Sequence, residues 1–473
     1  MSANVDPGSF RDRSARVFYS EGQILRALSA QALGNWNRLS ETSFYSHFSK
    51  MGALVRTERI PEPPPQGSAP SGQWVAFLRH ERLPFVSYPY EWCFGMLRDA
   101  ALLQLDLLLS ALAEGMILKD ATAFNVQWRG SRPVFIDIAS FETLAAGQPW
   151  TGYSQFCRSF LYPLLLEAYR GVPFRPWLRG ALEGIEPGQC WRLMSVRDLL
   201  RPGVLSHVYL QARAQARYGS TQRDVRAELR DAGFNPTLIA ANASGLRRLV
   251  ASLKPTSAES AWSEYAERNT YDDADSDRKR KFVLSIASAR RRSLAWDLGC
   301  NTGVFSRILG DHTDSVVALD SDAEAIERLY RTLKKEGNSV ILPLVSDLAD
   351  PSPSLGWRGR ERPHLPDRGR PELVLCLALV HHAVITANIP LDEFLEWLSS
   401  LGSELIVEFV TREDPMVRQL LRNKVDQYQD YDLANFERCM SQHFVVQRTE
   451  TLGSGTRVLY HAHPRQQRAL GRE

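Results

Sequence analysis

The feature that most constrains the fold is a regular alternation of strand-like and helix-like segments after Ala274. Apolar runs predict strands over residues 293–298, 315–320, 340–346, 372–379 and 404–410, and the amphipathic stretches between them predict helices from Val304, Ala323 and Leu391. Strands that are apolar along their whole length are typical of a parallel sheet covered by helices on both faces. Two later runs, 444–448 and 457–461, flank a glycine-containing turn and predict an antiparallel hairpin at the sheet edge.

A glycine-containing motif, Trp296-Asp297-Leu298-Gly299-Cys300-Asn301-Thr302-Gly303, follows the first predicted strand and opens a helix. Glycine at 299 and 303 allows a tight turn and the close approach of a ligand to the backbone. The spacing is not that of the dinucleotide-binding fingerprint, and a carboxylate in front of the loop is unsuited to a pyrophosphate. Asp297 instead suits a ligand that carries a positive amino group.

Two further carboxylates stand at the ends of the next two predicted strands. Asp320 can accept hydrogen bonds from ribose hydroxyls, and Asp347 can receive an adenine amino group. Ligands of open α/β sheets bind at the carboxyl ends of the strands. The three strand ends therefore predict a site for a nucleoside with an amino acid tail.

This constellation resembles the class I S-adenosylmethionine-dependent methyltransferases, from about Trp262 to Pro464. The resemblance implies a Rossmann-like, seven-stranded sheet of the α/β class and S-adenosyl-L-methionine as cofactor. It also implies the cofactor-binding residues, which are Asp297, Gly299 and Gly303 at the methionine end, Asp320 at the ribose, Asp347 and Leu348 at the adenine, and their neighbours Cys300, Asn301, Ser321 and Leu377. Many family members have a glycine where this chain has Asn301. An α/β fold whose aspartates only cap loops is the alternative.

Two adjacent histidines, His381 and His382, follow the fourth predicted strand, beside the expected position of the transferred methyl group. A neutral imidazole there can accept the proton of an attacking hydroxyl or amine, and of the two we favour His381 as the base. The histidines can equally cap a loop or pack against the adenosine, since methyl transfer also proceeds by orientation alone. No metal is expected in this half. Glu408, inside an apolar run, must be paired or lie at the site, and both remain open.

The N-terminal half carries Asp120, Asn125 and Asp137 after a helical stretch over 92–114, with two short strands expected at 126–128 and 133–136. This spacing resembles the catalytic loop and metal-binding aspartate of protein-kinase-like and aminoglycoside-phosphotransferase-like folds. The resemblance implies that Asp120 orients a hydroxyl and that Asn125 and Asp137 hold magnesium with ATP.

This chain departs from the kinase pattern in several places. Leu118 replaces the usual histidine, Ile138-Ala139 replaces Phe-Gly, and neither a glycine-rich phosphate loop nor a phosphate-binding lysine can be assigned before Trp74. A degenerate lobe that serves recognition is therefore preferred to a working phosphotransferase. An unrelated α+β domain is the third interpretation.

We expect three regions: an N-terminal α+β, kinase-like domain over 1–150, a mainly helical extension or bridge over 151–260, and the methyltransferase domain over 261–473. The segment 61–72 predicts a loop, and the proline- and arginine-rich segment 351–371 predicts a mobile surface insertion between two strands.

The change from acidic to basic residues over 270–281 predicts the start of a helix whose basic run, 278–281, is solvated. The aromatic residues before it, from Trp262 to Tyr271, are expected to serve in packing, and a lid over the cofactor is the alternative. Together with a methyltransferase, the motifs SYPYEW (87–92), LKDATAFN (118–125) and FIDIASFE (135–142) resemble a bacterial group of two-part, nodulation-type methyltransferase proteins.

The composition narrows the functional classes. A net charge of +3 does not produce an overall positive field that would attract nucleic acids. The six scattered cysteines, without a CxxC pair, fit a reducing cytoplasm. Residues 1–20 show no apolar signal segment, and no run is long enough to span a membrane.

These observations predict a cytoplasmic methyltransferase that acts on an O or N nucleophile of a small-molecule or carbohydrate acceptor. The alternatives are a bifunctional protein with an ATP-dependent phosphotransferase lobe and a non-catalytic cofactor-binding scaffold. The oligomeric state is left open.

Overall fold

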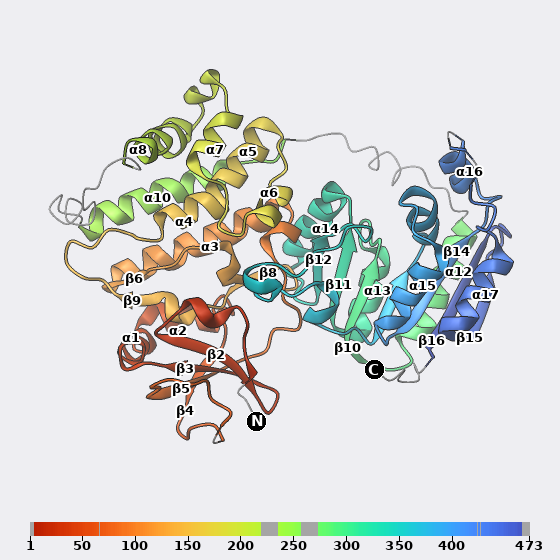
Figure 1. Ribbon diagram of the computed structural model, residues 1–473, viewed down its shortest axis with the longest axis horizontal. Coiled ribbons are helices and arrows are strands. Elements are labelled where there is room, and N and C mark those ends of the chain that lie inside the picture. The colour runs from red at the N-terminus through yellow and green to blue at the C-terminus, as the bar shows by residue number, and fades with distance from the viewer. Residues whose placement is uncertain are drawn as a thin grey trace.

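The computed structural model describes residues 4–65, 67–218, 235–256, 273–422, 424–425 and 427–465. The candidate lid, Trp262 to Tyr271, lies outside these residues. Figure 1 shows two halves side by side, the N-terminal half in red to green and the C-terminal half in green to blue. None of the described helices is long and apolar enough to cross a membrane.

The C-terminal half is built on one seven-stranded sheet in the order β12-β11-β10-β13-β14-β16-β15. Its strands are β10 (Arg292–Leu298), β11 (Thr313–Asp320), β12 (Ile341–Val345), β13 (Leu373–Cys376), β14 (Glu404–Val410), β15 (Phe444–Thr451) and β16 (Arg457–Pro464). Strands β10 to β14 are parallel, and β16 pairs antiparallel with both β14 and β15. The predicted sheet and hairpin are confirmed. β13 ends earlier than expected, and Ala378 just beyond it has a φ of 51°, which no strand residue adopts.

Helices cover both faces of this sheet: α12 (Asp273–Ala287), α13 (Val304–His312), α14 (Ala323–Glu336), α15 (Leu391–Ser400), α16 (Pro415–Leu421) and α17 (Leu433–His443). Helix α14 shows why the sequence folds in this way. The Asp322 side chain caps its first amides, Gly337 ends it in the left-handed region, and the buried residues Ile326, Leu329 and Leu333 recur on one face.

The N-terminal half begins with a five-stranded antiparallel sheet in the order β1-β2-β3-β5-β4. Its strands are β1 (Asn4–Val5), β2 (Ala15–Ser20), β3 (Gln23–Leu28), β4 (Thr57–Ile60) and β5 (Ala76–His80), and helices α1 (Ala30–Ser40) and α2 (Ser43–Lys50) stand between β3 and β4 in the chain. After the sheet in the chain, the apolar helix α3 (Phe94–Ala113) leads to β6 (Met116–Leu118), the hairpin β7 (Val126–Arg129) and β8 (Arg132–Phe135), and β9 (Phe141–Thr143), which pairs with β6. The predicted helix and two strands are therefore present.

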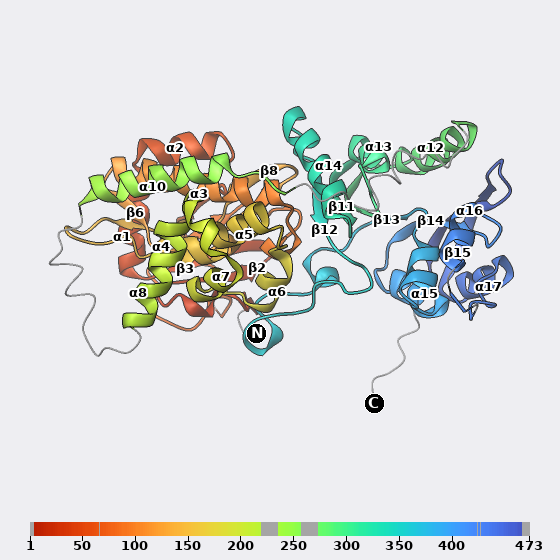
Figure 2. The same cartoon turned by 90° about the horizontal axis from the view of Figure 1, so that it is seen from above.

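The described part of 151–260 is helical, as expected. It contains α4 (Tyr153–Phe156), α5 (Tyr162–Arg170), α6 (Arg175–Gly180), α7 (Pro187–Leu193), α8 (Leu210–Tyr218) and α10 (Pro236–Ser252). Figure 2 shows α10 lying alongside α3, so these helices extend the N-terminal half. The three domain boundaries and the kinase-like character of residues 1–150 stay predictions.

The two halves meet through close backbone contacts and buried polar groups. The Gly95 amide at the start of α3 donates to Glu327 Oε2 of α14 at 2.7 Å, and Asp99, one turn further along α3, accepts from Tyr330 and Lys334 of α14. At the β7–β8 turn, Gly130 has a φ of 57°, and a Cβ there would lie 2.4 Å from the Ser339 carbonyl carbon. Only glycine fits both conditions.

The segment 351–371 lies between β12 and β13, as predicted, but the expectation that it stands free of the rest of the protein was wrong, because it packs on the N-terminal half. Arg368 donates to both carboxylate oxygens of Glu91 in the N-terminal half at 2.6 and 2.7 Å, and the two side chains are 1% and 2% exposed. Glu91 also accepts from Ser352, and Glu361 accepts from Arg11. The segment's proline- and arginine-rich composition is typical of a surface loop, but its partners stand far away in the chain and leave no local pattern.

Removing one member of the buried pair tests this interface. We expect Arg368→Ala to lower the free energy of unfolding by about 3–5 kcal/mol, because Glu91 would be left as an unpaired buried charge. Urea denaturation followed by circular dichroism measures the change. The control is Arg247→Ala, which removes a half-exposed ion pair with Asp106 and should lower the stability by about 1 kcal/mol at most. Equal effects of the two substitutions would contradict the interface described here.

Candidate functional site

The glycine loop after β10 forms a tight turn at the carboxyl edge of the parallel strands. Gly299 and Gly303 have φ values of 74° and 80°, and a Cβ on Gly303 would lie 2.6 Å from Leu329 of α14. The amides of Gly299 and Cys300 both donate to the Leu319 carbonyl, which holds the loop against β11. Asn301, with a φ of 49°, takes a backbone conformation that usually belongs to glycine. Asn301, in place of the glycine that many family members have, therefore preserves the shape of the loop.

Asp297 lies beneath this loop with only 2% of its surface exposed. Its Oδ2 accepts a hydrogen bond from the Ser306 hydroxyl of α13 at 2.5 Å. Burial, together with the nearby Asp320 carboxylate, raises the pKa of Asp297 to about 6. A carboxylate held in this way is stabilised by a cation, which agrees with the predicted amino group of the ligand.

Asp320, at the end of β11, is joined directly to the glycine loop. Its Oδ2 accepts from the Asn301 amide at 2.8 Å and its Oδ1 from the Asp322 amide at 2.9 Å. Burial raises the pKa of Asp320, and the amide hydrogen bonds oppose that shift. Each carboxylate oxygen keeps a lone pair, so ribose hydroxyls could still donate to it. Ser321 next to it is exposed.

The segment after β12 completes the edge. The Ser346 amide donates to the Asp320 carbonyl at 2.8 Å, and the exposed Asp347 accepts from the Ala349 amide at 2.9 Å. Leu348 is half-buried, and Leu377 after β13 is buried. Within the described residues, Ser346 Oγ and Asn301 Oδ1 are buried without a hydrogen-bond partner. Unpartnered polar atoms on two adjoining loops fit a ligand that brings polar groups of its own.

The two histidines lie next to each other after β13, with ring centroids 4.3 Å apart. His381 is 1% exposed, and its Nδ1 has no hydrogen-bond partner in the described part of the chain. Burial lowers the pKa of His381 well below its usual range and that of the half-buried His382 to about 4. Both imidazoles are therefore neutral at pH 7.

A buried ion pair that sequence reasoning missed lies between α12 and β14. Lys279 Nζ contacts Glu408 Oε2 at 2.5 Å, and the two side chains are 4% and 0% exposed. Arg457 reaches the other Glu408 oxygen at 3.5 Å and also bonds to Asp414. Glu408 is therefore an ion-paired core carboxylate, which answers the question that the sequence left open.

The prediction of a solvated basic run was wrong at Lys279. This lysine shares a helix face with the buried Phe282 and Val283, and that i, i+3, i+4 pattern could have revealed it. Its ammonium also lies 5.0 Å from the Phe305 ring centroid, on the helix that follows the glycine loop. Lys279 is near enough to Asp297 to oppose the rise of that carboxyl's pKa.

In the N-terminal half, Asp120, Asn125 and Asp137 lie close together. The Ser140 hydroxyl donates to Asp137 Oδ2 and accepts from Asn125 Nδ2 at 3.3 Å. Burial and the nearby Asp137 carboxylate raise the pKa of Asp120. Arg26, on the third strand, contacts Asp137 Oδ1 at 2.8 Å, so both carboxylate oxygens of Asp137 are engaged.

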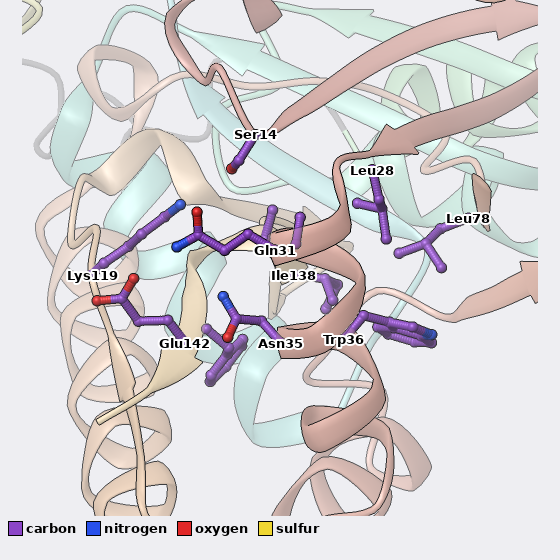
Figure 3. Close-up of a pocket in the computed structure, with 12 residues that line it drawn as sticks. Ser14, Leu28, Gln31, Asn35, Trp36, Leu78, Lys119, Ile138 and Glu142 are labelled. Carbon is purple, nitrogen blue, oxygen red and sulfur yellow. The ribbon is translucent and has the colours of Figure 1, made fainter. Parts of the chain in front are cut away.

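Next to this cluster is a cavity of about 30 Å³. Figure 3 shows the polar side chains of Gln31, Asn35, Lys119 and Glu142 on one side of it and those of Leu28 and Leu78 on the other. Such a volume holds one or two water molecules rather than a nucleotide.

The strand order, the glycine loop and the acidic strand ends define the C-terminal half as a class I S-adenosylmethionine-dependent methyltransferase fold. The chain belongs to the family of nodulation protein NoeA of Rhizobium meliloti (strain 1021). The two share 34% identity over 460 residues, which cover 96% of this chain and 94% of that protein. The predicted similarity to nodulation-type proteins is thereby confirmed at the level of the family. No model of a known protein family matches the chain.

Solved methyltransferase structures resemble part of the chain. N-methyltransferase NodS from Bradyrhizobium japonicum WM9, in complex with S-adenosyl-L-homocysteine, is 14% identical and covers 42% of this chain and 97% of its own, with a TM-score of 0.30. Magnesium protoporphyrin IX methyltransferase from Synechocystis PCC 6803 is 17% identical and covers 43% and 94%, with a TM-score of 0.31. At such scores, the assignment of the fold depends on the strand order and loops of this chain itself.

The raised pKa of Asp297 predicts that the free energy of unfolding of the ligand-free protein depends on pH. The folded-state pKa, about 6, lies above the ordinary value of 3.8, so the carboxyl stabilises the fold when protonated and that stability is lost as the pH rises through 6. We expect Asp297→Asn to raise the free energy of unfolding by about 1–3 kcal/mol at pH 8 and by much less at pH 4.

Urea denaturation at the two pH values measures this difference. The control is Asp311→Asn, at an exposed position of α13, which should change the stability little at either pH. If Asp297→Asn raised the free energy of unfolding by the same amount at pH 4 and pH 8, the burial of a charged carboxylate would not be the cause of the increase.

Proposed function

We propose that the protein is an S-adenosyl-L-methionine-dependent methyltransferase that acts on an O or N nucleophile of a small-molecule or carbohydrate acceptor. The observation that carries the proposal is the set of three carboxylates, Asp297, Asp320 and Asp347, at consecutive strand ends around the glycine loop. When bound, the cofactor supplies a methyl group on a sulfonium, which is already activated for transfer.

The residues of this chain would bind and orient the two reactants. Asp320 would accept from the ribose hydroxyls while its Asn301 contact keeps the loop in place. Asp297 would face the cationic amino acid end, where a positive charge stabilises its buried carboxylate. Asp347 and Ser346 would receive the polar edge of the adenine.

Either histidine after β13 could take up the proton that an attacking hydroxyl or amine loses. Both are neutral at physiological pH because burial lowers their pKa. His382 is the more accessible of the two, whereas His381 has the unpartnered Nδ1. Orientation of the acceptor remains the larger expected contribution.

Calorimetric titration with S-adenosyl-L-homocysteine tests the cofactor assignment. We expect binding by the wild type and an affinity about ten- to a hundredfold lower for Asp320→Ala, since one contact of a charged group with the ribose is lost. Absence of binding by the wild type, or unchanged binding by the variant, would contradict the proposal. Transfer of a labelled methyl group to a panel of metabolites then separates an enzyme from a non-catalytic cofactor-binding scaffold.

A phosphotransferase activity of the N-terminal half is the second candidate, because Asp120, Asn125 and Asp137 lie together. The residues as arranged do not fit a magnesium ion. Arg26, a cation, and the Ser140 hydroxyl engage both oxygens of Asp137, and Asn125 is turned toward Ser140. Arg26 also lies on the third strand, which in kinases carries the phosphate-binding lysine. This supports a recognition module rather than a working kinase.

A thermal-shift experiment tests this interpretation. We expect ATP with magnesium to leave the unfolding temperature of the wild type unchanged, because Arg26 neutralises the carboxylate that would hold the ion. S-adenosyl-L-homocysteine is the positive control on the same protein. A magnesium-dependent shift that Asp137→Ala abolishes would establish nucleotide binding and overturn the interpretation.

A further inference from the structure

The segment that follows β12 belongs in sequence to the methyltransferase half, but the N-terminal half holds it. At its start, the Ser346 amide is bonded to the Asp320 carbonyl within the carboxyl edge of the sheet. Its continuation, residues 347–352, leaves the sheet and contacts α6 and the short helix η2 (Pro89–Glu91), which pack against each other. We call residues 346–352 the adenine loop, after the group that it would bind.

The first anchor of the adenine loop is Arg179, on α6. Its guanidinium donates to both carboxylate oxygens of Asp350, at 2.7 and 2.9 Å, and to the carbonyls of Asp350 and Pro351, at 3.2 and 3.3 Å. A planar guanidinium that contacts a carboxylate and two successive carbonyls fixes the direction of the chain as well as its position. Asp350 stands three residues after Asp347.

The second anchor is Ser352, whose hydroxyl donates to Glu91 Oε1 at 2.7 Å. Glu91 is itself fixed, because its carboxylate is held by Arg368 and accepts from the Tyr88 amide at 2.9 Å. The adenine loop is therefore attached to the sheet at one end and to the N-terminal half at the other. Between these attachments, Asp347 is exposed and Ser346 Oγ is buried without a partner among the described residues.

We propose that Arg179 is a positioning residue for the cofactor, and that the N-terminal half holds the adenine loop in the shape that binds adenosine. This inference rests on the function proposed above. A loop that is ordered before the ligand arrives binds more tightly, because the cost of ordering it has already been met in folding. The two halves thus form one cofactor site in energetic terms, although the carboxylates that would touch the cofactor all lie in the C-terminal half.

The affinity for S-adenosyl-L-homocysteine, measured by calorimetry on the full chain, tests the proposal. We expect Arg179→Ala to weaken binding about two- to fivefold, since a partly exposed pair is lost and the loop is less well ordered. The matched control is Arg247→Ala. It removes an Arg–Asp pair that is also partly exposed but lies wholly within the N-terminal half, between α10 and α3, and it should leave the affinity unchanged.

Exchange of the two charges separates positioning from a general loss of stability. Arg179→Asp and Asp350→Arg should each weaken binding at least as much as Arg179→Ala. The double variant should recover part of the affinity, because the ion pair is restored in reverse while the hydrogen bonds of Arg179 to the two carbonyls are not. Hydrogen exchange should show faster amide exchange over 347–352 in the single variants only.

Three outcomes would overturn the inference while the wild type still binds: an unchanged affinity of Arg179→Ala, an equal loss for Arg247→Ala, or a double variant whose losses simply add. If the wild type itself does not bind S-adenosyl-L-homocysteine, the proposed function fails, and this inference fails with it. The two failures are therefore distinguishable.

Discussion

The buried contact between Glu91 and Arg368 is the interaction on which the arrangement of the two halves depends. An ion pair withdrawn from water is stable only when its geometry is good and its remaining polar atoms are satisfied. Here the guanidinium contacts both carboxylate oxygens and the Val86 carbonyl, and the Tyr88 amide and the Ser352 hydroxyl donate to Glu91. Most polar atoms of the pair are thus satisfied, although Arg368 Nε has no hydrogen-bond partner among the described residues. Because the partners are 277 positions apart in the chain, this contact holds a segment of one half on the surface of the other.

At the carboxyl edge of the large sheet, the carboxylates Asp297 and Asp320 are not matched by an ion pair of this kind among the residues that the structure describes. Asp297 is buried and Asp320 is half-buried, and burial raises the pKa of each, so ionising these carboxyl groups costs free energy when no ligand is bound. By contrast, Lys279 and Glu408 neutralise each other a short distance away. Carboxyl groups whose burial costs free energy in the absence of a ligand are typical of binding sites, where local stability is given up for function.

Local patterns in the sequence predicted most of the C-terminal fold. Continuous apolar strands and capped amphipathic helices depend on neighbouring residues. The bounds of β10 to β14 were therefore predicted within a few residues, and the helices α13, α14 and α15 begin where they were expected. The Asp320–Asn301 contact was predictable in kind, because the ends of parallel strands must meet at one edge. The packing of the segment 351–371 on the N-terminal half and the ion pair of Lys279 were missed, since each depends on a partner more than a hundred positions away. In the N-terminal half, the sequence spacing singled out Asp120, Asn125 and Asp137, which lie close together. Nothing in the sequence indicated that Arg26 contacts Asp137.

Periodicity and glycine-containing turns are local properties of the chain, so they fix which elements form and which chemical groups stand at the strand ends. The contacts that those groups make depend on the folded chain. Folding placed Arg26 on the carboxylate that a metal would need, and it anchored the adenine loop through Arg179 of the other half. Charges act through space at a few ångströms, and the chain brings such charges together only when it is folded.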